Sequence, residues 1–397
     1  MTNQTALAGD IKDRLYHFLG APEGFVPLHE PEFRGEEEAL VTDCIRSGWV
    51  SSVGQYVDRF ETDIAKVCGT RYGVAVVNGT AALEVSLRIM GVGPGDEVLM
   101  PSLTFIATAN ATSHLGAVPH FVDIEERTLG ISPKALKAHL EKIGERRDGS
   151  VYNRETGRRL AAVVPMHVFG HPVDMNGLNA VAAEFGLQVI EDAAEALGSL
   201  YGDKPCGGLA PIAALSFNGN KILTTGGGGA IVTNDETLAR RAKHLTTTAK
   251  QPHAWAFRHD EIGYNYRMPN LNAALGVAQL AQLDTRLAQK RQLAQAYLEA
   301  FSGHPDLQVL AEPEGARSNY WLNALVLAPH AAAARDTILE TLNGAGLMAR
   351  PVWEPLHTLP IYADAPRADL PVTMDLAARI INVPSSAHLV GALACPA

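Results

Sequence analysis

The sequence has few of the features that mark secreted or metal-binding proteins. Only four cysteines occur among 397 residues, and they are Cys44, Cys68, Cys206 and Cys395. No two of them have metal-ligand spacing, so we expect free thiols in a reducing compartment and no metal site. The N-terminus, MTNQTALAGDIKDRLYHF, lacks the basic-then-apolar order of a signal peptide.

Other features that the sequence lacks argue against a membrane, a nucleic acid or a dinucleotide as its partner. No apolar run reaches membrane-spanning length. The formal net charge is -10 and no long basic run occurs, which argues against a nucleic-acid partner. No G-x-G-x-x-G follows the first predicted strand, which argues against a nucleotide-binding dehydrogenase. The sequence therefore predicts a cytoplasmic protein, and an acidic total still allows a local cationic pocket for a phosphorylated ligand.

What is present indicates a large α/β protein. Apolar residues make up 47% of the chain and charged residues 19%, an ordinary globular balance with material for a large core. Short β-rich runs alternate with helical stretches, and most are continuous apolar, as in strands buried on both faces of a mainly parallel sheet. The runs are Val74–Val77, Glu97–Pro101, Val118–Asp123, Ala161–Val168, Leu187–Glu191, Ala213–Phe217 and Ala230–Thr233.

The length fits two lobes. We predict an N-terminal arm (1–35), a large domain (36–285) and a smaller C-terminal α+β domain (286–397). Within these, a loop is expected around Trp49, and the polar, turn-rich stretch 144–159 predicts an exposed hairpin or loop. The Ala/Leu/Gln-rich stretch from Pro269 to about Phe301 predicts one long helix joining the lobes.

Gly79 and Thr80 stand where a strand ends and a helix begins, in the stretch VNGTAAL. A helix N-terminus has free N–H groups and a positive dipole end, which suit a phosphate. The alternative is an ordinary N-cap in an α/β unit.

Glu191 and Asp192 lie at the carboxyl end of a buried strand, in VIEDAAEA. Open α/β sheets bind ligands at that edge. An acid there can pair with a cationic heteroaromatic nitrogen, and the small residues after Asp192 let a flat ring approach. The alternative is a helix-capping Asp.

Ser216 and Lys221 lie in SFNGNK, and a glycine run follows in TTGGGG. Ser216 can bind phosphate, Lys221 can act as an amine nucleophile, and the glycines let the backbone pass close to a ligand. The alternative is an exposed loop with a solvated lysine. Together, in this order, the three constellations supply what a pyridoxal-phosphate (PLP) enzyme needs: a phosphate cup, an acid for the ring nitrogen and a Schiff-base lysine.

With these motifs in this order, the sequence resembles the DegT/DnrJ/EryC1/StrS family of sugar aminotransferases. The resemblance spans about residues 25–385. The matching stretches are VNGTAAL, GDEVLMPSLTFIATANA, HFVDI, VIEDAAEALGS, SFNGNK…TTGGGGAIVT, GYNYRMPNLNAALG, RPVWEPLH and NVPSS. It implies the PLP transferase fold of type I, PLP as cofactor and homodimers with composite active sites.

The resemblance also implies a role for individual residues. Lys221 corresponds to the Schiff-base lysine and Asp192 to the partner of the pyridinium nitrogen. Gly79, Thr80 and Ser216 correspond to phosphate ligands. Phe105 takes the position of the aromatic ring that stacks on the pyridine. Glu195 takes a place beside the ring hydroxyl where many relatives have Gln, and Asn265 resembles a residue that reaches the neighbouring subunit's cofactor phosphate.

Two differences from the commonest pattern of this family bear on which substrate we expect. Gly227 replaces the acid of the more common TTGEGG, and the turn before the lysine is Asn-Gly-Asn. With the polar insertion near 144–159, these resemble the legionaminic-acid type, which aminates C4 of a UDP-linked 2-acetamido-4-keto-6-deoxy sugar. We therefore expect transfer from L-glutamate to such a sugar, the alternative being a GDP- or dTDP-linked 3- or 4-keto sugar.

Further alternatives are of other classes. A PLP-dependent sugar dehydratase of the same fold carries His where this chain has Lys221. A non-catalytic PLP-binding regulator finds little support, since no DNA-binding segment is visible. His167 and His171 follow a strand, and a packed or substrate-adjacent position is favoured over a catalytic one.

Overall fold

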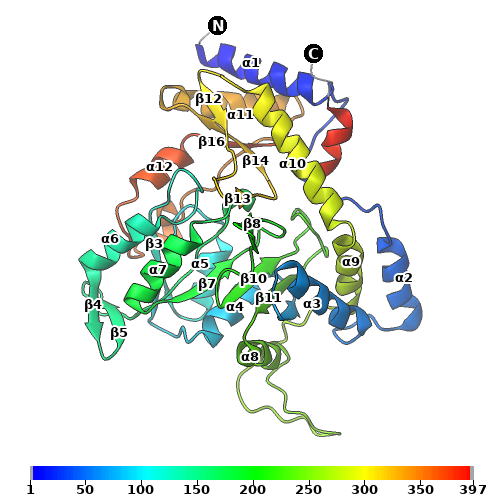
Figure 1. Cartoon of the computed structure of the whole chain (residues 1–397), viewed down its shortest axis with the longest axis vertical. Helices are drawn as coiled ribbons and strands as arrows, with labels where there is room; N and C mark the ends of the chain where they lie inside the picture. Colours follow the sequence, from blue (N-terminus) through cyan, green and yellow to red (C-terminus); the bar gives the residue numbers. More distant parts are fainter. Residues whose placement is uncertain (1–2, 394–397) are drawn as a thin grey trace.

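A seven-stranded sheet forms the centre of the larger part of the chain (Figure 1). In the computed structural model, which describes residues 3–393, the strand order is β1-β11-β10-β7-β6-β2-β3. β11 is antiparallel to both neighbours, and the other pairs are parallel. The bounds are β1 Tyr72–Val76, β2 Glu97–Pro101, β3 Val118–Val122, β6 Leu160–Val163, β7 Gln188–Asp192, β10 Ile212–Ser216 and β11 Gly229–Thr233. The predicted mainly parallel sheet is confirmed.

Helices cover both faces of this sheet, which explains why its strands are apolar at successive positions. Val98 and Met100 face one layer of helices, whereas Leu99, between them, faces the other. The first layer contains α4 (Gly79–Ile89), α5 (Ala107–His114) and α8 (Glu236–Thr246). The second contains α3 (Gln55–Val67), α6 (Pro133–Ile143), α7 (Met175–Phe185) and α9 (Asn270–Leu280).

The smaller part is built on a four-stranded antiparallel sheet of order β12-β14-β16-β15. Its strands are β12 Leu307–Val309, β14 Asn323–Leu327, β15 Arg350–Pro351 and β16 Ile380–Val383, with helices α10 (Leu283–Ala300), α11 (Arg335–Gly344) and α12 (Pro371–Ala377). Helix α1 (Asn3–Phe18) lies beside α11 (Figure 1), and its Ile11 and Leu15 join a core with Leu325 and Ile381. The predicted arm thus contributes a helix to the core of the smaller part.

The predicted helix after Pro269 is two helices, and this expectation was wrong. α9 ends at Leu280 and α10 begins at Leu283. Between them Gln282 leaves helical geometry, with φ -107° and ψ 2°. Its side-chain amide donates to Glu37 Oε1 at 2.6 Å, so a contact with α2 (Glu37–Ser47) accompanies the break.

The two predicted loops are confirmed. The stretch around Trp49 is non-helical and connects α2 to α3. The polar insertion is a hairpin of β4 (Gly144–Arg147) and β5 (Ser150–Asn153). A small three-stranded sheet joins β8 (Leu200–Tyr201), β9 (Lys204–Pro205) and β13 (Ala316–Arg317).

The cysteines and the helix lengths complete the description. Cys44, Cys68 and Cys206 are buried free thiols, and Cys395 lies outside the described residues. Over residues 3–393, no helix combines the length and the apolarity that crossing a bilayer requires.

The packing of α9 on α3 generates a stability prediction. A Cβ at Gly276 would lie 2.5 Å from Phe60 Cε2 and 2.9 Å from Thr225 Cγ2. Gly276→Ala should therefore destabilise the fold by about 1–3 kcal/mol through overpacking, although Ala favours helices by about 1 kcal/mol. Thermal unfolding measures this. Gly9→Ala in α1 is the matched control, since nothing lies within 4 Å of its Cβ, and it should raise the melting temperature. An equal rise for both variants would contradict the packing argument.

Candidate active site

The candidate site lies at the carboxyl edge of the parallel strands. β7 ends at Asp192, β10 ends at Ser216, and α4 begins at Gly79 shortly after β1. β7 and β10 are neighbours in the sheet, with Asp192 opposite Ala214. Because parallel strands end at one edge, side chains far apart in the sequence are brought together there.

Gly79 and Ser216 are in contact. A Cβ at Gly79 would lie 2.9 Å from Ser216 Cβ and 3.3 Å from Ser216 Oγ. Asn78 caps α4, its side chain accepting a hydrogen bond from the Ala81 N–H at 2.8 Å. Thr80, partly buried, is the second residue of the helix. The first N–H groups of α4 therefore lie beside a serine hydroxyl, a donor set that suits a phosphate.

Asp192 is a buried carboxyl held by two donors. Its Oδ2 accepts from Thr108 Oγ1 at 2.7 Å and its Oδ1 from the Ala194 N–H at 3.2 Å. Burial raises the pKa of Asp192 above its usual value, although the Thr108 hydroxyl opposes the shift. A cation placed against this carboxyl would stabilise its ionised form, so the position suits a cationic ring nitrogen.

The buried Glu195 and the largely enclosed Lys221 form an ion pair. Lys221 Nζ lies 3.0 Å from Glu195 Oε1, and the other carboxylate oxygen accepts from the Phe169 N–H at 2.9 Å. Burial raises the pKa of Glu195 to about 7, and the Lys221 charge acts against this. Lys221 Nζ also lies 3.8 Å from the centroid of the Trp321 ring. The lysine is therefore an amine in a largely enclosed setting, not a solvated side chain.

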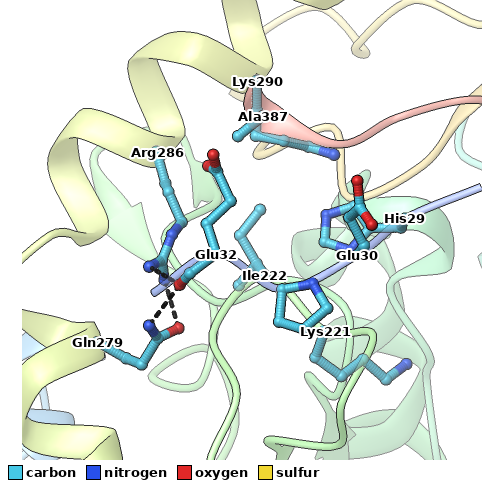
Figure 2. Close-up of a pocket in the computed structure, with 10 residues that line it drawn as sticks. His29, Glu30, Glu32, Lys221, Ile222, Gln279, Arg286, Lys290 and Ala387 are labelled. Carbon is cyan, nitrogen blue, oxygen red and sulfur yellow. Dashed lines mark hydrogen bonds between the residues drawn. The ribbon is translucent and has the colours of Figure 1, made fainter. Parts of the chain in front are cut away.

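Figure 2 shows the residues that line a small pocket beside this lysine. Its lining includes Lys221, Gln279, Arg286 and Lys290, and the Lys221 side chain points away from Arg286. The Arg286 guanidinium donates to Gln279 Oε1 at 2.7 Å and to the Glu32 carbonyl at 3.0 Å. Lys290 donates to two backbone carbonyls. Both side chains come from α10, so they link this helix to neighbouring backbone segments.

Phe105 and Asn265 lie apart from this ion pair. Phe105 is half exposed, and its carbonyl accepts from the Thr108 N–H, one turn before the hydroxyl that binds Asp192. Asn265 is exposed, and its Oδ1 accepts from the Arg267 guanidinium. The structure thus brings Gly79 against Ser216 and Glu195 against Lys221. Asp192 ends β7, the strand beside the one that carries Ser216. The hydrogen-bond partner of the Asn265 side chain is Arg267, not another predicted site residue.

The predicted pair of carboxylates separates. Successive residues of a strand point to opposite faces, so only Asp192 meets Thr108. Glu191 points to the other face, where its carboxylate accepts from His167 Nε2 at 3.0 Å and from the Leu209 N–H at 3.0 Å. Since the Val173 N–H donates to His167 Nδ1, His167 is a packed residue. His171 is also buried, and burial lowers its pKa to about 4.

Sequence reasoning missed two residues of the site. Thr108 lies in the quoted stretch TFIATANA, and its spacing of one helical turn from Phe105 was a usable signal. Trp321 gave none, because it is 100 residues from Lys221 in the chain and reaches it only through the tertiary fold.

Similarity to known proteins extends over nearly the whole chain. The profile of the DegT/DnrJ/EryC1/StrS aminotransferase family matches residues 31–393. The chain is similar to the GDP-perosamine synthase of Vibrio cholerae, at 35% identity over 361 residues that cover 91% of this chain and 94% of the synthase. It is 37% identical over 339 residues to the putative pyridoxal phosphate-dependent aminotransferase EpsN of Bacillus subtilis (strain 168), covering 85% and 84%.

The fold has solved counterparts. The crystal structure of DesI in the presence of its TDP-sugar product superposes with a TM-score of 0.80 at 29% sequence identity, covering 92% of this chain and 90% of that chain. The expected type I PLP transferase fold is thereby confirmed.

The raised pKa of Glu195 generates a pH prediction for the cofactor-free protein. Folded Glu195 keeps its proton to about pH 7, whereas its usual pKa is 4.5. The proton therefore adds stability that is fully present below pH 4.5 and is lost as the pH rises through about 7. Glu195→Gln removes this contribution. Urea unfolding across this range should show wild-type stability falling relative to the variant as pH rises. Parallel pH curves would refute the buried, protonated state.

Proposed function

This chain belongs to the DegT/DnrJ/EryC1/StrS aminotransferase family, and from that premise we propose that it moves an amino group from L-glutamate to a keto carbon of a nucleotide-linked sugar. It is a PLP-dependent aminotransferase. The observation that supports the proposal best is the Lys221 amine, whose side chain is only 11% exposed and which lies between the Glu195 carboxyl and the Trp321 ring.

The residues at the sheet edge fit PLP. The contact of Gly79 with Ser216 makes a cradle that any side chain at position 79 would fill, and nothing lies within 4 Å of a Cβ at Gly219 or Gly227. We assign the phosphate to Gly79, Thr80 and Ser216. The other assignments are Asp192 for the ring nitrogen, Glu195 for the ring hydroxyl, Phe105 for the ring face and Lys221 for the covalent link.

The side chains of this protein then have separate roles in the reaction. Bound PLP supplies an electron-accepting ring. The Asp192 carboxylate, ionised against a cation, holds a proton on the ring nitrogen. The Lys221 Nζ, once free, carries a proton to and from the reacting carbon as a general acid–base. Glu195 holds that nitrogen at 3.0 Å, and the enclosing residues limit the access of water.

Two acceptor classes are supported by different observations. The GDP-perosamine synthases similar to this chain favour a GDP-linked sugar. The departures at Asn218–Asn220 and Gly227 favour a UDP-linked 2-acetamido-4-keto-6-deoxy sugar, aminated at C4. We place the GDP-linked sugar first, because the similarity to those synthases extends over nine-tenths of the chain.

Incubation of the enzyme with PLP, L-glutamate and GDP-, UDP- and dTDP-linked keto sugars tests the function. We expect 2-oxoglutarate and an aminated sugar, identified by mass and NMR, and loss of both with the cofactor's yellow band in Lys221→Ala. The matched control is Lys134→Ala, which removes an exposed lysine of α6 and should leave turnover unchanged. Normal turnover by Lys221→Ala would overturn the assignment, and no amination of any sugar would overturn the substrate class.

The exposed face near Asn265 supports a homodimer with shared sites. The segment after α8 extends away from the rest of the molecule in Figure 1. It carries Trp255, Phe257 and Ile262, which are 84%, 79% and 82% exposed. Apolar side chains this exposed are typical of an interface. A second copy would cover them, and we assign Asn265 to the partner's phosphate.

Mixing two inactive variants tests the shared site. In a mixed dimer of Lys221→Ala and Asn265→Asp, one site receives both lesions and the other neither, so up to half the sites in such dimers should recover. Steady-state activity after subunit exchange measures this, with each variant alone as the control. No recovery in demonstrated mixed dimers would refute the shared site, and an active monomer would refute the dimer.

A further inference from the structure

Trp321, from the smaller part of the chain, contacts the site lysine in two ways. The centroid of its ring lies 3.8 Å from Lys221 Nζ. Its indole N–H donates to the carbonyl of Asn220, the residue before the lysine, at 2.7 Å. One side chain thus fixes the backbone at the base of Lys221 and presents an aromatic face to its Nζ.

The backbone of Trp321 is itself fixed on both sides. Its N–H donates to Asn319 Oδ1 at 2.8 Å, and its carbonyl accepts from Lys290 Nζ at 2.8 Å. Lys290 is fully buried and also donates to the Ser385 carbonyl. The position of the Trp321 ring is therefore set by hydrogen bonds at its N–H, its carbonyl and its indole nitrogen.

Asn319 connects Trp321 to the other residue that contacts the amine. Its side-chain Nδ2 donates to the Glu195 and Leu197 carbonyls, both at 2.9 Å, while its Oδ1 accepts from Trp321. Asn319 is buried, and its Oδ1 would lie 1.9 Å from a Cβ at Gly170. One amide therefore couples the backbone of Glu195 to the backbone of Trp321.

Two strained residues border this arrangement. Tyr320, between Asn319 and Trp321, has φ 48°, and Phe169, whose N–H donates to Glu195, has φ 55°. Bulky residues in this region cost about 1–3 kcal/mol each and persist where the surroundings over-determine them, a pattern typical of functional sites.

We propose that Trp321 is a positioning residue for Lys221 and that Asn319 sets Trp321 and Glu195 at matched positions around its amine. The inference rests on the proposed role of Lys221. Through Trp321 and Asn319 the smaller part of the chain determines where the amine rests when it is free. Without the ring, Lys221 samples additional rotamers and reaches the reacting carbon less often.

Trp321→Leu and Trp321→Phe separate the ring from the indole N–H. Borohydride fixation of PLP followed by peptide mass spectrometry measures the rate at which Lys221 becomes linked. For Leu we expect that rate and kcat to fall about tenfold, since small displacements of a catalytic group are costly, with KM for glutamate within about twofold. Phe retains the face and should recover most of the loss. Wild-type rates in the Leu variant would overturn the inference.

Asn319→Asp, which keeps the shape but replaces the donating amide with a carboxylate, tests the coupling. Because the amide couples the backbone of Glu195 to that of Trp321, the double variant with Trp321→Leu should lose less of the labelling rate than the sum of the two single losses. Fully additive losses would overturn the coupling even if the Leu variant alone behaved as expected. If wild-type Lys221 is not labelled at all, the proposed function fails. A labelled wild type with an equally labelled Leu variant refutes the inference alone.

Discussion

The ion pair between Lys221 and the buried Glu195 is the interaction on which the site depends. A charge removed from water is costly unless a partner and further hydrogen bonds compensate it. Here the carboxylate is supported by the Phe169 N–H and the ammonium by the Trp321 face. Because these two supports come from separate segments, the pair also fixes how those segments meet. Removing either charge leaves the other without its partner in a largely enclosed position.

Burial disfavours the ionised form of two carboxyl groups in the site. Asp192 and Glu195 both have pKa values raised by burial, so each is held partly toward its protonated form. A ligand that brings a cation to Asp192 and a polar ring substituent to Glu195 supplies what the protein lacks. The absence of a side chain at Gly79, where a Cβ would lie 2.9 Å from Ser216 Cβ, lets the start of α4 approach Ser216 closely. The family's cofactor has these properties, which is why the residues and the chemistry agree.

The sheet was predictable because both its faces are covered by helices. Each strand then has to be apolar at successive positions, and that pattern is visible in the sequence without any partner. The break between α9 and α10 was not predictable from the sequence, because the local sequence favours helix throughout. The break accompanies a contact between Gln282 and Glu37, which lie 245 residues apart in the chain. Strand geometry explains why Glu191 and Asp192 point to opposite faces of the sheet. Predicting this would have required knowing that the strand continues through Asp192.

The sequence by itself determined the α/β class, and it predicted the carboxyl edge as the place of chemistry with Lys221, Asp192 and Ser216 as its carriers, since these depend on local order along the chain. Only the tertiary structure decided that Thr108 holds Asp192, that Trp321 contacts Lys221 and that Asn319 links Trp321 to Glu195. Such contacts depend on how separate segments pack in space, and hydrogen bonds between segments leave no periodic or spacing signal in a single sequence.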